Sequence, residues 1–132
     1  MIKQLFRIDR YDWKVIVLYE ISYRDADYVI DMLKQMDAPD YILRNAYKNV
    51  NEGQPNTGFI YSDYDKQRSI IVVSKTTSNR ELIDTIVHEA NHLQSHIATV
   101  FNLDEKGEEV CYLIGDIVKR MYKVFNKIIS AQ

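Results

Sequence analysis

A long helical pattern dominates the second half of the chain and leaves few choices for the fold around it. Ser78 and Glu81 have the S-x-x-E spacing of a capping box, in which each side chain hydrogen-bonds to a backbone N–H group at the helix start. The residues that follow are amphipathic with a helical period, so the sequence predicts one helix over about residues 79–101. This helix also carries the most specific chemical motif of the chain.

Strands are expected before it. Residues 2–8 and 13–21 are rich in β-branched and aromatic side chains and are separated by a short polar segment, which predicts a β-hairpin. The segments FIYS and RSIIVVS, on either side of DYDKQ, predict a second hairpin whose last strand is 68–74. Residues 51–58 contain Gly, Pro and Asn and predict a loop.

Three more helices complete the predicted elements. Ser22 can cap one over 23–37, which the Ala38-Pro39 step should interrupt before a short helix at 40–49. After a loop at 102–107, a last helix should run over 108–129. Its apolar stripe consists of Val110, Ile114, Ile117, Met121, Val124 and Ile128. Helices and hairpins in this order predict a single α+β domain over 1–132, with a small sheet.

Composition narrows the function classes. Hydrophobic residues make up 46% of the 132 residues and charged residues 27%, which is typical of a globular domain. A net charge of −2 argues against a nucleic-acid binder. We expect no signal peptide and no membrane span, because the N-terminus lacks a long apolar core and no apolar run approaches about 18 residues. The one cysteine, Cys111, excludes an intramolecular disulfide and fits a reducing compartment, so a cytoplasmic protein is expected.

The motif is His88-Glu89-Ala90-Asn91-His92, in the middle of the long helix. Positions four apart lie one turn apart on the same helix face, so both histidines can bind one zinc ion at about 2.0–2.1 Å. Glu89 projects from a neighbouring angle, within reach of a water on the metal. H-E-x-x-H on a helix is the pattern of zinc metalloproteases, in which the glutamate is the general base.

A catalytic zinc site needs a third protein ligand. His96 is a poor candidate, because it lies about 12 Å along the helix axis from His88. A metzincin arrangement would need glycine at 95 and histidine at 98, where this chain has Ser95 and Ala98.

Two glutamates at the start of the last helix remain as candidates. Glu108 shares its side of the helix with Cys111 and Gly115, whose small side chains would let a neighbouring helix approach, so Glu108 is preferred. Glu109, the alternative third ligand, shares its side with the polar Asp116. Both glutamates would also be favourable charges at a helix N-terminus without any metal.

His88-Glu89-x-x-His92 followed by a helical glutamate resembles the gluzincin arrangement of zinc metallopeptidases. It also looks like the ImmA/IrrE-type minimal peptidases, whose glutamate opens a helix that has an aromatic residue four positions later; by that likeness Glu108 would pair with Tyr112. Residues 56–118 resemble small zincin-like proteins of phages and mobile elements. The resemblance implies a minimal zincin-like domain, with two hairpins packed on helices and the motif on a long central helix.

The sequence therefore predicts a zinc-dependent peptidase acting on a peptide or protein substrate. Glu89 would be the general base, and Tyr112 is the first candidate to stabilise the oxyanion, with Tyr61 and Tyr64 behind it. Asp84 and Asp116 could orient the histidines. By resemblance, the edge of strand 68–74 would accept the substrate. The alternative is a non-catalytic, metal-binding zincin-like scaffold that acts as a protein-interaction module.

Overall fold

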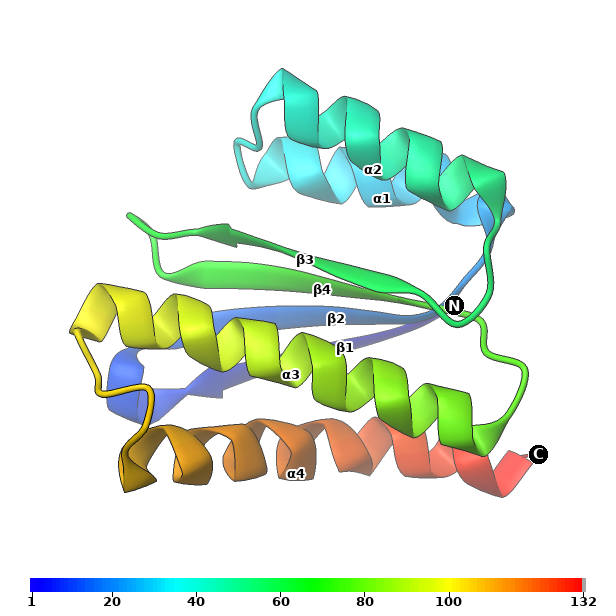
Figure 1. Cartoon of the computed structure of the whole chain (residues 1–132). Helices are drawn as coiled ribbons and strands as arrows, with labels where there is room; N and C mark the ends of the chain where they lie inside the picture. Colours follow the sequence, from blue (N-terminus) through cyan, green and yellow to red (C-terminus); the bar gives the residue numbers. More distant parts are fainter. Residues whose placement is uncertain (132) are drawn as a thin grey trace.

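The computed structural model describes residues 1–131, and it is an α+β fold, as predicted. Four strands form one sheet, and a pair of helices covers each of its faces (Figure 1). In chain order the elements are β1 (Ile2–Ile8), β2 (Trp13–Ile21), α1 (Ala26–Gln35), α2 (Asp40–Glu52), β3 (Gly58–Asp63), β4 (Arg68–Ser74), α3 (Asn79–Phe101) and α4 (Glu108–Ala131), with short 3-10 turns at Asp9–Tyr11 and Tyr23–Asp25.

The sheet has the strand order β1-β2-β4-β3. Both predicted hairpins are confirmed as antiparallel pairs, β1 with β2 and β3 with β4. A parallel pairing of β2 with β4, which the sequence did not predict, joins the two hairpins into one mixed sheet. β4 is therefore hydrogen-bonded on both sides, and the expectation that strand 68–74 offers a free edge to a peptide is wrong. Within this sheet the edge strands are β1 and β3.

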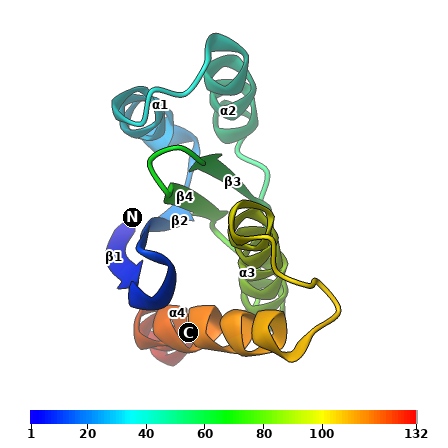
Figure 2. The same cartoon turned by 90° about the vertical axis from the view of Figure 1, so that its left-hand side faces the viewer.

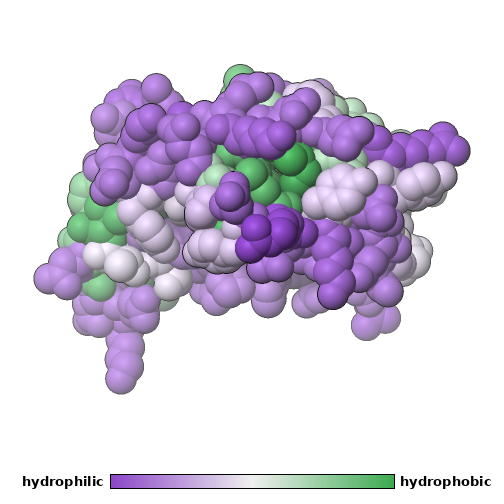
Figure 3. All heavy atoms as spheres, turned by 90° about the horizontal axis from the view of Figure 1, so that it is seen from above, coloured by the Kyte–Doolittle hydropathy of each residue, from purple (hydrophilic) through white to green (hydrophobic). Residues whose placement is uncertain are grey.

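Alternation along the inner strands divides the core into two layers, because successive side chains point to opposite faces. On β2, Val15 and Val17 are buried against α3 and α4, whereas Leu18 is buried against α1 and α2. Figure 2 shows the two helix pairs on opposite sides of the sheet. The surface seen from the α1–α2 side is mostly hydrophilic, with apolar atoms visible in the gaps (Figure 3).

The helix that carries the motif has the predicted bounds and one half of the predicted capping box. The Ser78 hydroxyl accepts a hydrogen bond from the Glu81 backbone N–H at 3.2 Å. The helix ends at Asn102, which is left-handed with φ 52°, a conformation that asparagine tolerates better than most residues. α2 runs three residues beyond its predicted end and stops where Gly53 takes φ 67°.

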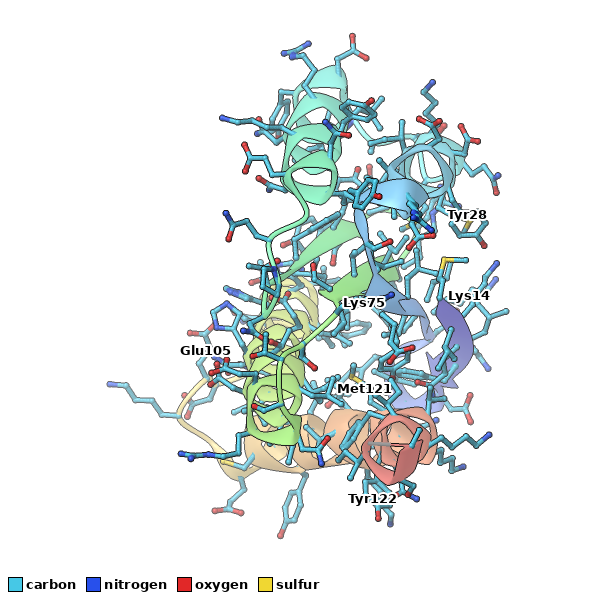
Figure 4. All side chains as sticks on the ribbon, turned by 90° about the vertical axis from the view of Figure 1, so that its right-hand side faces the viewer. Lys14, Tyr28, Lys75, Glu105, Met121 and Tyr122 are labelled. Carbon is cyan, nitrogen blue, oxygen red and sulfur yellow. The ribbon has the colours of Figure 1, made fainter. Side chains whose placement is uncertain are left out.

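The buried face of α4 differs in detail from the predicted stripe. Leu113 and Phe125 are in the core, whereas Ile114 and Val124 are only half-buried. Val110, Ile117, Met121 and Ile128 are buried as predicted. Figure 4 shows Met121 pointing from α4 toward the sheet, while the next side chain, Tyr122, points away.

The expectation that small residues on α4 receive a neighbouring helix is also wrong. Cys111 and Gly115 are exposed, and a Cβ atom added to Gly115 would meet no atom within 4 Å. Among residues 1–131, no helix is both long enough and apolar enough to cross a membrane.

Candidate functional site

The side chains of the two motif histidines lie in contact on the exposed face of α3. The Nε2 atoms of His88 and His92 are 3.2 Å apart, and their rings meet edge to face. One ion bound tetrahedrally at 2.0–2.1 Å from both nitrogens would separate them by about 3.3 Å. The separation of the two nitrogens therefore matches that of two zinc ligands, and it equally allows a hydrogen bond from one ring to the other.

Glu89 lies under the histidines and is almost completely buried, with 2% of its surface exposed. Its Oε1 is 3.8 Å from His88 Nε2, and its Oε2 has no hydrogen-bond partner among the described residues. Burial raises the pKa of the Glu89 carboxyl, and the nearby charge of His88 opposes that rise. A buried carboxylate with an unsatisfied oxygen is costly for stability alone and is characteristic of functional sites.

Space for Glu89 depends on a glycine in the neighbouring strand. A Cβ atom at Gly58 would lie 2.9 Å from the Val72 carbonyl oxygen, 3.1 Å from Thr85 Cγ2 and 3.2 Å from Glu89 Cγ. Gly58 is not in a left-handed conformation, so the close contacts of β3 with both β4 and α3 are what require glycine here.

Edge strand β3 forms the wall beside the histidines. Its even positions Gly58, Ile60 and Ser62 face α3, whereas Phe59 and Tyr61 pack against the α1–α2 core. Between β3 and α3 is a cavity of about 350 Å³ lined by Gly58, Phe59, Ile60, His88, Glu89, His92 and His96. An adjoining cavity of about 320 Å³ is also lined by His88 and Glu89, and it includes the predicted orienting residue Asp84.

A larger cavity, of about 540 Å³, lies between β1, β2 and α1. Its lining is mostly apolar with a rim of Arg7, Lys14 and Arg68, and it contains no histidine, cysteine or carboxylate. The histidines and the buried Glu89 carboxyl thus line the β3–α3 cavities and not this larger one.

His96 is half-buried at the end of the same cavity. Its Nδ1 is 2.7 Å from the hydroxyl of Ser62, and the Tyr64 ring packs against it with the centroids 5.5 Å apart. Burial lowers the pKa of His96, with a smaller contribution from His92, so the neutral ring is favoured.

The candidate third ligands are not gathered at this cavity. Glu109 is hydrogen-bonded by the Tyr11 hydroxyl and ion-paired with Arg10 at 2.8 Å, whereas the exposed Glu108 makes no hydrogen bond or ion pair with residues 1–131. Within that range no three His, Cys, Asp or Glu side chains are arranged to hold a metal ion. His88 and His92 therefore lie together, and neither glutamate at the start of α4 lies with them at this cavity.

The other predicted residues are dispersed. Tyr112 is 74% exposed and lines a separate cavity with Tyr11 and Glu109. Tyr61 is on the far face of the sheet, and Asp116 is bound to Arg120 at 2.9 Å. Of the tyrosine candidates, Tyr64 is the one that contacts a histidine of the cavity.

Sequence reasoning missed Gly58 and Ser62. The signal was present, because β3 alternates its aromatic residues, Phe59 and Tyr61, with the non-aromatic Gly58, Ile60 and Ser62, and alternate residues of a strand face the same neighbour. The local sequence does not show which helix packs against that face of the strand. Comparison of the chain with protein-family models, with curated proteins and with solved structures gave no match.

Proposed function

We propose that this protein is a zinc-dependent hydrolase that cleaves peptide bonds. The observation that carries the proposal is the arrangement of His88 and His92, whose Nε2 atoms are 3.2 Å apart, above a buried Glu89 with an unpartnered oxygen. In H-E-x-x-H metallopeptidases two imidazoles at this spacing bind the zinc ion, and the adjacent glutamate accepts the proton of the attacking water.

In the proposal His88 and His92 hold the ion, and Glu108 completes its protein ligands. Glu108 is the better choice over Glu109, because Glu109 would first have to give up Tyr11 and Arg10. Glu108 opens α4 directly after the 102–107 loop, and it has no such contacts to break. α3 continues for nine residues beyond His92, about 14 Å along its axis, before the loop that leads to Glu108. For Glu108 to bind the ion, the end of α3 and the start of α4 therefore have to rearrange together.

A bound zinc ion would polarise the substrate carbonyl and make water more acidic. Glu89 takes the proton from the attacking water and returns it to the leaving amine. Its burial supports this role, because a raised carboxyl pKa makes Glu89 a stronger base than an exposed glutamate. Gly58 keeps β3 close enough to hold Glu89 away from solvent.

The substrate in this proposal is an extended peptide segment. β3 is an edge strand, and its residues Gly58, Phe59 and Ile60 line the cavity of the histidines. A peptide that adds to the free edge of β3 as a further strand would pass beside His88 and His92, with backbone hydrogen bonds providing affinity.

The decisive variant is Glu89→Gln, in protein purified without chelators. We expect about one zinc per chain by elemental analysis in both wild type and Glu89→Gln, and loss of peptide hydrolysis only in the variant. Glu81→Gln, on the same helix but outside the cavity, is the matched control and should keep its activity. Zinc-free wild-type protein, or an unchanged hydrolysis rate in Glu89→Gln, would contradict the proposal.

A second function, metal binding without turnover in a protein-interaction scaffold, is favoured by one observation: among residues 1–131, neither Glu108 nor Glu109 lines the cavities of the histidines. The same variant separates the two functions. If the scaffold is correct, wild-type protein binds zinc through His88 and His92 but hydrolyses no peptide, and Glu89→Gln changes neither property.

A further inference from the structure

His96 is connected to the interior of the protein by a chain of buried hydrogen bonds. The Trp13 indole Nε1 is 2.8 Å from Ser69 Oγ, which is 2.6 Å from Ser62 Oγ, which in turn is 2.7 Å from His96 Nδ1. Trp13 is fully buried and Ser69 nearly so, at 0% and 1% exposure. These hydrogen bonds lead from Trp13, in the core on the α3–α4 side of the sheet, to the cavity that the motif histidines line.

The direction of these hydrogen bonds is determined by the innermost one, between Trp13 and Ser69. An indole N–H can only donate, so Ser69 accepts from Trp13. The hydroxyl proton of Ser69 then has one acceptor among residues 1–131, the oxygen of Ser62. Ser62 in turn donates its own proton to His96 Nδ1. The reverse direction would leave the buried Ser69 proton without an acceptor, which proteins avoid.

The tautomer of His96 follows from this direction. A neutral ring that accepts at Nδ1 carries its proton on Nε2. That nitrogen has no hydrogen-bond partner among the described residues, and it is not among the buried unsatisfied atoms, so it is open to the cavity or to solvent. The edge-to-face contact with Tyr64 helps to fix the orientation of the ring.

We infer that His96 is the hydrogen-bond donor of the site: its Nε2–H is held ready for the carbonyl oxygen of the substrate, and His96 is not a metal ligand. This inference rests on the proposed function and adds to it the donor for the developing oxyanion, the role that Tyr112 was expected to fill. A donor held rigidly before the reaction stabilises negative charge on that oxygen without reorganisation.

Nitrogen-15 NMR of the histidine rings tests the tautomer directly, with and without zinc. We expect the Nε2–H form for His96 in wild type, and a mixture of forms in Ser62→Ala, which removes the donor to Nδ1. Ser95→Ala is the matched control, because the Ser95 hydroxyl binds Glu105 and does not contact His96. A wild-type ring protonated at Nδ1 would overturn the inference.

Kinetics and zinc content test the role. His96→Ala should lower kcat about 10²- to 10³-fold while zinc content and KM stay close to wild type. His96→Gln, which can still donate, should recover part of the loss. Zinc lost from His96→Ala, as expected for His88→Ala, would make His96 a ligand and refute the inference, as would an unchanged kcat. If wild-type protein hydrolyses nothing, the proposed function fails, while the NMR and zinc measurements still decide the state of His96.

Discussion

Gly58 lets the edge strand β3 lie close to both the neighbouring strand β4 and the motif helix α3. In Gly58→Ala the new Cβ would be 2.9 Å from the Val72 carbonyl oxygen, a backbone atom that cannot turn aside. We expect a loss of about 1–3 kcal/mol in the free energy of unfolding, measured by urea denaturation, because overpacking forces the elements apart. Displacement of Glu89 should also lower any hydrolytic rate.

The control for this substitution is Gly115→Ala. Gly115 is on the exposed side of α4, where an added Cβ meets nothing within 4 Å. Alanine is the better helix former, so this variant should gain up to about 1 kcal/mol. Equal effects of the two substitutions on the free energy of unfolding would show that β3 is packed less closely against β4 and α3 than these contacts indicate.

At the same scale, the sequence was sufficient for the motif but not for its surroundings. The spacing of His88 and His92 predicts their pairing, because a helix alone determines it. The tie of Glu109 to Tyr11 and Arg10 depends on where the β1–β2 connection lies against α4, and no local pattern encodes that. The small residues Cys111 and Gly115 first suggested Glu108 as the ligand. The argument for Glu108 over Glu109 now depends instead on the contacts of Glu109 with Tyr11 and Arg10.

Among the elements, α3 carries the motif and depends on its N-terminal cap. Ser78→Ala removes the hydroxyl that accepts from the Glu81 N–H, so we expect the free energy of unfolding to fall by about 1 kcal/mol. Thermal denaturation followed by circular dichroism measures the change. Thr99→Ala is the control, because among residues 1–131 the exposed Thr99 hydroxyl bonds only to the Ser95 carbonyl oxygen, within the helix, and caps no helix end.

Element boundaries were predicted where the signal is local. Capping residues, alternation and turn residues fixed both hairpins and all four helices to within a few positions. The rotation of α4 was missed because apolar residues occur on both flanks of its stripe. Leu113 and Ile114 are adjacent, about 100° apart around the helix, and only the packed sheet decides which one is buried.

The whole molecule has two cores that share one sheet. Leu33 of α1 is fully buried in the core on the face opposite the motif helix. Leu33→Ala should cost about 2–5 kcal/mol by leaving a cavity, yet unfold in one transition, since both cores depend on the same strands. Zinc content of the folded variant should equal wild type. Two separate transitions in the denaturation curve would contradict this coupling.

The parallel ladder between β2 and β4 was not predicted, because it pairs residues such as Ile16 and Ile70 that are distant in the chain. Such contacts form slowly, since a long intervening segment has to be closed first. During synthesis the ribosome releases β2 well before β4 and α3 exist. If the proposed function is correct, Glu89 is therefore not enclosed in an unfinished chain and cannot yet activate water. Peptide hydrolysis would begin only when the whole molecule has folded.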